Sequence, residues 1–320
     1  MKLTGLLLGL LVSISALAQE DAVRSYPSKP IHIVVGYSAG GGNDIIVRVL
    51  APHMQEGLRQ PVVVENRPGA QGIIANELVA KSAPDGYTLL MGPSGPMTMN
   101  PAIYEKLPYD SLRDYAPITM IGSFPLILVV NPELPARTVK ELIGYAKAHP
   151  EKANYGASAA PFQLASELFN LKTGTKFQHI PYKGSGDSVN AVVSGQVTMT
   201  IADTAPVVGP LKGARVRGLA VTSPQRHPAF PDLPTLMESG VDIEVVLWTA
   251  FLAPAKTPAA VVSRIRDEVV RVVKIPQVEE RLSQMGIDPV ANTPDQFRRI
   301  MAQDIAKWTA VAKAAHIKAE

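Results

Sequence analysis

The sequence predicts an α/β protein of two lobes, built from alternating strands and helices and joined by two segments that cross between them. Apolar runs of strand length alternate with helix-periodic segments near the N-terminus, the pattern of a parallel sheet covered by helices. A second such series fills the middle of the chain, and a proline-rich stretch leads back from it. One lobe therefore uses both ends of the chain and the other its middle. This topology suits hinge closure around a ligand.

The first lobe is expected to open with a buried strand over residues 31–35 and an amphipathic helix over 43–55. Further along, the turn Pro84-Asp85-Gly86 introduces another strand. These later elements are a strand over 62–64, a helix over 73–82 and a strand over 87–91. Near the C-terminus, Thr293-Pro294-Asp295-Gln296 predicts a helix start, because it joins a capping box to a proline at the first helical position.

The second lobe is expected to begin where the apolar run over 124–130 reaches Asn131-Pro132. Thr138 and Glu141 predict a capping box for the helix that follows. The predicted elements of this lobe are helices over 138–149, 162–173 and 187–194 and strands over 178–180, 197–202 and 218–222. We assign residues 27–125 and 245–320 to lobe 1, and residues 126–244, ending in a proline-rich return linker over about 224–244, to lobe 2.

The N-terminus has the pattern of a cleaved secretory signal peptide over residues 1–18. Lys2 precedes an uncharged, leucine-rich run, and Ala16-Leu17-Ala18 supplies the small residues of a cleavage site. The alternative is a membrane anchor, but the apolar run is shorter than the roughly 20 residues that span a bilayer. We therefore expect a periplasmic protein.

The composition argues against several classes of function. The 320-residue chain has 31 basic and 28 acidic residues without a basic cluster, so nucleic-acid binding is not expected. It contains no cysteine, and its six histidines show neither H-x-x-x-H nor H-x-H spacing, so no metal site is expected. No cofactor is expected either, because the chain lacks the G-K-[ST] and G-x-G-x-x-G patterns of nucleotide-binding loops after its glycines.

A glycine-rich loop after the first strand poses the main functional question. Gly36-Tyr37-Ser38-Ala39-Gly40 fits the G-x-S-x-G elbow of serine hydrolases, which would make Ser38 a nucleophile. Gly40-Gly41-Gly42 instead fits a loop whose backbone N–H groups hold an anion at a helix start, or a simple tight turn. The hydrolase hypothesis is weak, since the elbow follows the first strand and no H-G-G oxyanion loop precedes it.

Several motifs together resemble those of one receptor family. The most specific is Val62-Val63-Val64-Glu65-Asn66-Arg67-Pro68-Gly69-Ala70, followed by Pro84-Asp85-Gly86-Tyr87-Thr88-Leu89. The others are Tyr26-Pro27-Ser28-Lys29-Pro30-Ile31, Leu107-Pro108-Tyr109-Asp110, Pro181-Tyr182-Lys183-Gly184, Leu219-Ala220-Val221-Thr222 and Ala253-Pro254. From Tyr26 onward the chain resembles the solute-binding proteins of tripartite tricarboxylate transporters, the TctC or Bug family of periplasmic receptors. The resemblance implies a type II periplasmic-binding-protein fold, whose two lobes close on a small carboxylate.

The resemblance also implies that the glycine loop contacts the ligand. The family's loop has the form P-F-P-P-G-G-x-x-D, which here becomes residues 36–44. Ser38 stands where the family has proline or alanine, so its hydroxyl is a candidate ligand contact. Asp44 is expected either to organise the loop or to cap the helix. The candidates in this loop are Tyr37, Ser38, Ala39, Gly40, Gly41, Asn43 and Asp44.

A second candidate loop departs from the family's form. Many members carry S-x-G-x-G-T-x-x-H-L, whereas residues 155–164 here are shorter by two and lack the glycines, the threonine and the histidine. Pro161 fits the first helical position and Ala160 the N-cap, which would leave the first N–H groups of the helix open to a carboxylate. The candidates are Ser158, Ala159, Ala160 and Phe162.

Further candidates follow the carboxyl ends of strands, where open α/β sheets bind ligands. Ser94 follows the third strand, with an ordinary turn as the alternative. Tyr182 and Gly184 are favoured by the family resemblance. Asp203 and Thr204 end a strand of lobe 2, where the Asp203 carboxylate could receive a ligand amine or hydroxyl or could cap the next segment.

The expected function is that of a receptor without enzymatic activity, which captures a small organic carboxylate and delivers it to the membrane subunits of a tripartite tricarboxylate transporter. The alternatives are a binding protein that feeds a signalling receptor kinase, and a serine hydrolase that uses Ser38. We expect a monomer with no cofactor, metal or nucleic-acid partner. The sequence leaves open which carboxylate binds. The predicted loops contain no cationic cluster that would favour citrate, but Lys183 keeps citrate among the candidates.

Overall fold

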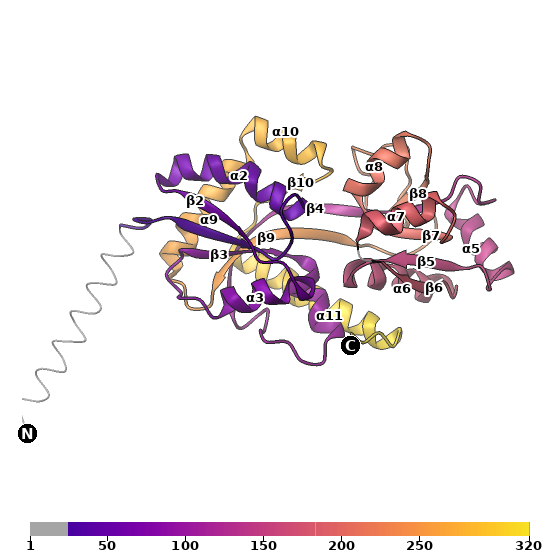
Figure 1. Ribbon diagram of the computed structural model, residues 1–320, viewed down its shortest axis with the longest axis horizontal. Helices are drawn as coiled ribbons and strands as arrows, with labels where there is room; N and C mark the ends of the chain where they lie inside the picture. The colour runs from indigo at the N-terminus through magenta and orange to yellow at the C-terminus, as the bar shows by residue number, and fades with distance from the viewer. Residues whose placement is uncertain (1–24, 183, 320) are drawn as a thin grey trace, which may run out of the picture.

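The computed structural model describes residues 25–182 and 184–319, so the predicted signal peptide over residues 1–18 lies outside the described residues. Two α/β lobes lie side by side, and the strands β4 (Tyr115–Val130) and β9 (Val246–Pro254) run from one toward the other (Figure 1). This is the two-lobed α/β fold that the sequence predicts. Within the described part of the chain, each helix is too short or too polar to cross a membrane.

In lobe 1, strand β1 (Ile31–Val35) lies between the parallel strands β2 (Val62–Asn66) and β3 (Thr88–Pro93). The sheet continues through the antiparallel strand β9 to the first part of β4, which also pairs with β10 (Asp288–Pro289). The helical segments of this lobe are α2 (Gly42–Leu58), η1 (Ala70–Gly72), α3 (Ile73–Ala80), η2 (Gly95–Met99), α4 (Asn100–Ile103), α9 (Ala259–Val273), α10 (Pro276–Gln284) and α11 (Pro294–Ala314).

Helices cover both faces of this sheet because β1 is apolar on both. Ile31 and Ile33 share a buried cluster with side chains of α2 and α9. Val34 points to the opposite face, into a cluster with α3 and α11. Burial on both faces explains why β1 is an uninterrupted apolar run rather than an alternating one.

In lobe 2, the second part of β4 pairs with β7 (Met199–Asp203) and β8 (Arg217–Val221). Beyond β7 lie the parallel strands β5 (Asn154–Ala157) and β6 (Gln178–Pro181). The helices of this lobe are α5 (Val139–Ala148), α6 (Ala160–Thr173), α7 (Ser185–Val193) and α8 (Thr204–Lys212). Helices α6, α7 and α8 each begin just after the carboxyl end of a strand, which brings three helix N-termini to one edge of the sheet.

Strand β4 changes partners between Pro125 and Leu126, where the chain crosses between the lobes. Up to Pro125 it pairs with β9, and from Leu126 onward with β7 and β8. The buried hydroxyl of Thr222 connects the two crossing segments, since it accepts from the Leu126 N–H at 2.8 Å and donates to the Val245 carbonyl at 2.6 Å. The lobe boundaries assigned from the sequence remain a prediction.

The end of α11 also reaches lobe 2. Trp308, Val311 and Ala312 share a buried cluster with side chains of α6, among them Leu164 and Phe169. Figure 1 shows this part of α11 running beneath α6. The last helix of lobe 1 is therefore a third link between the lobes, beside the two crossing strands.

The element types predicted from the sequence are confirmed, and several of the predicted boundaries are wrong by a few residues or more. The strand predicted over 124–130 is the second half of β4, which begins at Tyr115. Helix α6 has Ala159 rather than Ala160 as its N-cap, which moves Pro161 from the first helical position to the second.

The predicted helix caps have mixed outcomes. The capping box of Thr293 and Gln296 at the start of α11 is confirmed. At the start of α5, the Thr138 hydroxyl accepts from the Glu141 N–H at 3.2 Å, but the Glu141 carboxylate accepts from the N–H of Arg137. Only half of that predicted box is therefore formed.

Candidate functional site

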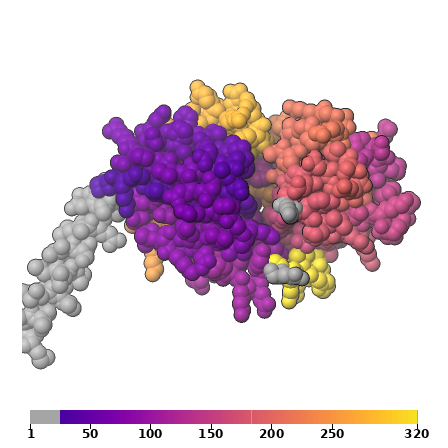
Figure 2. All heavy atoms as spheres, viewed as in Figure 1, coloured from indigo at the N-terminus to yellow at the C-terminus, as the bar shows by residue number. Residues whose placement is uncertain are grey.

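A cavity of about 610 Å³ lies between the lobes and is lined by residues of both. Figure 2 shows the two lobes meeting along a furrow in the surface. The residues predicted from the sequence that line the cavity are Tyr37, Ser38, Gly41, Asn43, Ser94, Ser158, Ala159, Phe162, Gly184, Asp203 and Thr204. The predicted residues that are not part of its lining are Ala39, Gly40, Asp44, Ala160 and Tyr182.

Asp44 is buried and organises the glycine loop instead of facing the cavity. Its carboxylate accepts hydrogen bonds from the Gly40 N–H at 2.8 Å, from Nε of Arg48 at 2.9 Å and from Nδ2 of Asn66 at 2.9 Å. The bond from Arg48 is the largest cause that lowers the pKa of Asp44 to about 2, and burial acts against it. Gly40 has a φ of +81°, which glycine adopts readily, so Asp44 holds a backbone turn that requires glycine.

The glycine loop has fewer open N–H groups than the sequence suggested. The Gly40 N–H is engaged as described, and the Gly41 N–H donates to the Ser38 carbonyl at 3.2 Å. The N–H groups of Gly42 and Asn43, in the first turn of α2, have no acceptor among the described residues. Gly42 and Asn43, which both line the cavity, therefore keep open N–H donors.

Ser38 has no neighbour that would make it a nucleophile. A serine hydrolase needs a base within hydrogen-bond reach of its serine. Histidine is absent from the described lining of the cavity, so the elbow-like pattern has no histidine base beside it there. Burial raises the pKa of the adjacent Tyr37 to about 12, so its phenol stays protonated and can donate to an anion.

Strand β9 fixes one wall of the cavity. The N–H of Trp248 donates to the hydroxyl of the buried Ser94 at 3.3 Å, and its indole Nε1 donates to Asp304 at 2.8 Å. Trp248 is thus both a packed side chain and part of the lining. The Thr249 hydroxyl donates to the side-chain oxygen of Asn43 at 3.1 Å, which attaches the first turn of α2 to this strand.

The second loop has fewer open donors than predicted. The carbonyl of Ala159 accepts from the Phe162 N–H at 3.1 Å, and Pro161 has no N–H to offer. Ala160 is buried in a core cluster of lobe 2, although its N–H has no acceptor among the described residues. The hydroxyl of Ser158, which lines the cavity, is an open donor at this edge.

Four helices, α2, α6, α7 and α8, begin at the cavity, represented in its lining by Gly42, Pro161, Ser185 and Thr204. The N-terminus of a helix carries the positive end of the helix dipole and stabilises anions. Lysine, arginine and histidine are absent from the described lining, and Lys183 lies outside the described residues. The described part of the chain also holds no group of three acidic or histidine side chains placed for a metal ion.

Several lining residues were not identified from the sequence. Gln71 and Asn100 contribute polar groups, and Nδ2 of Asn100 donates to the Gln71 carbonyl at 3.3 Å. Gln71 has a φ of +51°, which residues other than glycine seldom adopt. Gln71 directly follows the family motif that ends at Ala70, and this position could have identified it as a candidate site residue. Apolar walls come from Ile46, Phe124, Leu247, Met285 and Ile287.

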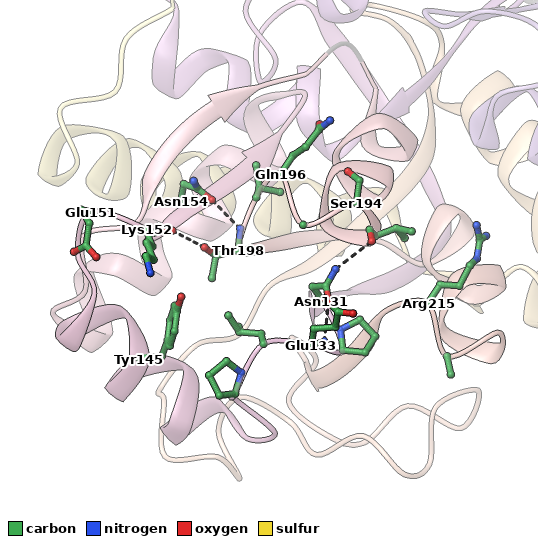
Figure 3. A pocket seen from close by; sticks show the side chains of 17 residues that line it. Asn131, Glu133, Tyr145, Glu151, Lys152, Asn154, Ser194, Gln196, Thr198 and Arg215 are labelled. Atoms are coloured by element: carbon green, nitrogen blue, oxygen red, sulfur yellow. Dashed lines mark hydrogen bonds between the residues drawn. The ribbon is translucent and has the colours of Figure 1, made fainter.

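A larger hollow, of about 900 Å³, lies at the end of β4 remote from the hinge (Figure 3). Surface side chains such as Glu151, Lys152 and Arg215 line it, and Asn154 accepts from the Thr198 N–H at 2.7 Å. All of its lining residues belong to lobe 2, so movement of the lobes would not enclose a ligand there. We therefore take the cavity between the lobes as the candidate site.

Two α/β lobes, two crossing strands and a ligand-sized cavity between them define the class of two-lobed solute-binding proteins. Residues 46–317 match the sequence profile of the TctC family, the tripartite tricarboxylate transporter family receptors, and the chain belongs to this family. The resemblance noted from the sequence is thus confirmed. The family is one of solute-binding receptors, not of enzymes.

The chain is similar to known proteins along nearly its whole length. Protein BugT of Bordetella pertussis is 36% identical over 319 residues, which cover 98% of each chain. R. palustris Rpa4515 with adipate is 33% identical, with a TM-score of 0.83 over 92% of this chain and 99% of that one. MatC (Rpa3494) from Rhodopseudomonas palustris with bound malate is 27% identical, with a TM-score of 0.79 over 89% of this chain and 99% of that one.

Proposed function

We propose that this protein is a periplasmic receptor that captures a small organic carboxylate between its lobes and delivers it to the membrane subunits of a tripartite tricarboxylate transporter. The observation that carries the proposal is the convergence of four helix N-termini on one cavity between two hinged lobes. The adipate and malate held by two similar proteins are both carboxylates, which supports an acid as the ligand. We further propose that residues 1–18 direct export and that the mature protein is monomeric.

One ligand carboxylate would be bound from both sides, directly or through ordered water. The N–H groups of Gly42 and Asn43 would donate from lobe 1, and the Ser158 hydroxyl from lobe 2. The protonated phenol of Tyr37 is a further donor. Because all these donors are neutral dipoles, closure does not bury an uncompensated cation.

The test is a thermal-unfolding screen of the mature protein, refolded to remove bound ligand, against carboxylates and the corresponding neutral amides. A ligand at a hundred times its dissociation constant adds about 2.7 kcal/mol to the free energy of unfolding. A rise of several degrees is therefore expected with one class of acids and none with the matched amides. An equal response to acids and amides, or no response to any acid, would contradict the proposal.

Delivery to a transporter is tested separately. In the source organism, deletion of the gene should abolish uptake of the acid identified in the screen. If uptake persists and only a transcriptional response to the acid is lost, the protein feeds a signalling receptor kinase instead.

A further inference from the structure

Asp203 is a half-buried acidic residue of the cavity that the proposed carboxylate site leaves unused. It ends strand β7 and occupies the N-cap position of α8, but its side chain makes no capping hydrogen bond. Its Oδ1 is buried and has no hydrogen-bond partner among the described residues. Of the two roles expected from the sequence, capping is therefore wrong, and contact with a ligand is left for a residue that lines the cavity.

This unpartnered oxygen is unusual in its position as well as its burial. Four other buried side-chain atoms in residues 25–182 and 184–319 lack a hydrogen-bond partner, in Asn76, Ser111, His227 and Asn292, although His227 Nε2 lies 3.3 Å from the Asp288 carboxylate. None of those residues lines the cavity between the lobes, whereas Asp203 does. Buried polar atoms are almost always paired in folded proteins, so an unpaired acceptor at a ligand site indicates a partner that arrives with the ligand.

No neighbouring cation among the described residues compensates the negative charge of an ionised Asp203. Burial raises the pKa of its carboxyl, and the Ser185 hydroxyl and the backbone N–H of Asp203 offset this only in part. No charged side chain of the described residues is among the groups that shift this pKa. An ionised Asp203 therefore gains most from a ligand that brings a donor, and it repels a second carboxylate placed beside it.

The open donors of α2 belong to lobe 1 and Asp203 to lobe 2, so a ligand that fills the closed cavity can touch both. Between them the walls include the apolar side chains of Ile46, Phe124 and Leu247. The cavity thus combines N–H donors, an apolar middle and a carboxylate acceptor. This arrangement fits an acid whose carbon chain ends in a hydrogen-bond donor.

We infer that Asp203 accepts a hydrogen bond from a hydroxyl or ammonium group of the ligand, so that the receptor selects hydroxy- or amino-carboxylates over plain monocarboxylates and dicarboxylates. The inference rests on the proposed function, because the same ligand must place its own carboxylate at the helix N-termini. Asp203 is then a specificity-determining residue, which acts on the end of the ligand remote from that carboxylate.

The experiment is isothermal titration calorimetry with two series of acids that differ only at one end. One series is hexanoate, 6-hydroxyhexanoate, 6-aminohexanoate and adipate, and the other is the four-carbon equivalents. At about pH 7.5 the hydroxy acid, the amino acid or both should bind the wild type at least about tenfold more tightly than the other two acids. Which of the two binds better distinguishes a hydroxyl from an ammonium partner.

Substitution of the acceptor should reverse this order. Asp203→Asn is expected to lose most of the preference for the amino acid and to bind adipate or succinate more tightly, because the amide is neutral and can donate. Asp187→Asn is the matched control: Asp187 is an exposed acid in the first turn of α7, outside the lining, and its loss should leave the order unchanged.

The outcomes separate this inference from the proposed function. If the acids bind but the wild type does not discriminate among their ends, or if Asp203→Asn keeps the wild-type order, the inference is wrong and the receptor function stands. If no acid of either series or of the earlier screen binds the folded wild type, both are wrong. The ligand comparison needs only the wild-type protein, so it holds even if Asp203→Asn does not fold.

Discussion

The hydroxyl of Thr204 in lobe 2 donates a hydrogen bond to the carbonyl of Met285 in lobe 1, at 3.2 Å. The next residue, Gly286, lies so close that a Cβ atom there would come within 3.0 Å of the Thr204 Oγ1. A second close approach joins Gly95 of lobe 1 to Pro161 of lobe 2, where an added Cβ would lie 3.1 Å from the proline ring. Two glycines thus allow the lobes to meet around the cavity, as a closed receptor requires.

Gly95→Ala is expected to weaken ligand binding about tenfold while leaving the free energy of unfolding nearly unchanged. The new methyl group meets the rigid Pro161 ring only when the lobes are closed, and overpacking of this kind costs roughly 1–3 kcal/mol. Calorimetry with an acid from the screen measures the effect.

The matched control for this change is Gly144→Ala in α5, where an added Cβ would meet no atom within 4 Å. We expect it to leave affinity unchanged and to stabilise the helix by about 0.5–1 kcal/mol. If Gly95→Ala and the wild type bind the acid with equal affinity, Gly95 and Pro161 lie further apart in the ligand-bound protein than in this structure.

Thr222→Val is expected to lower the free energy of unfolding by about 1–3 kcal/mol, because it leaves a buried N–H and a buried carbonyl without their partner. The Thr222 hydroxyl bridges Leu126 of β4 and Val245 before β9, so its loss acts on both crossing segments. Urea denaturation measures the change. The control is Thr222→Ser, which keeps the hydroxyl. If Thr222→Ser loses as much stability as Thr222→Val, packing of the methyl group contributes more to stability than the hydrogen bonds of the hydroxyl.

Local patterns explain which parts of the fold could be predicted from the sequence. Strand β1 is a pure apolar run and α11 starts with a complete capping box, so both are specified by neighbouring residues. The first half of β4 is not, because Pro117 and Gly122 interrupt its pattern. The structure accommodates them where the register with β9 shifts, which depends on a strand far away in the sequence.

In the candidate site, too, some features could be predicted from neighbouring residues and others depend on contacts formed only in the folded chain. Asp203 could be located because it ends a predicted strand, and ligands bind at the carboxyl ends of such strands. Which N–H groups remain open could not be predicted, since it depends on how each loop folds onto itself. The Asp44 carboxylate accepts a hydrogen bond from the Gly40 N–H, and the Ala159 carbonyl accepts one from the Phe162 N–H.

Asp44→Asn is expected to lower the free energy of unfolding by about 1–2 kcal/mol near pH 7. The pKa of Asp44 is about 2 in the folded protein, below its ordinary value of 3.8, so folding favours the ionised form. This stabilisation is complete above about pH 4 and is lost as the pH falls through about 2. Urea denaturation at several pH values should therefore give a difference from the wild type that shrinks in this window.

The control for Asp44 is Asp267→Asn, which removes an exposed acid paired only with Arg266 on the surface. It should change stability by less than about 0.5 kcal/mol at every pH. A difference between wild type and Asp44→Asn that is the same at pH 7 and in acid would show that its effect comes from side-chain shape and not from charge.

The affinity for an amino acid ligand should fall on acidification, and that for a dicarboxylate should rise. Burial raises the pKa of Asp203, so this carboxyl takes up a proton at a higher pH than an ordinary aspartate does. Ionised Asp203 accepts from an ammonium group, whereas protonated Asp203 can donate to a second carboxylate. Tyr37, the other titratable residue in the described lining, has a pKa of about 12 and stays protonated throughout.

Calorimetry with 6-aminohexanoate and adipate from about pH 8 to about pH 6.5 measures this effect, a range in which the ligand carboxylates stay largely ionised. The helices that pack against β7 carry the charged side chains Glu167 and Lys172 in α6, Asp187 in α7 and Lys212 in α8. None of these is among the groups that shift the pKa of Asp203. In Asp203→Asn the two affinities should not diverge with pH. If the two affinities diverge with pH as in the wild type, another group titrates, and Asp203 is not the residue that binds the end of the ligand remote from its carboxylate.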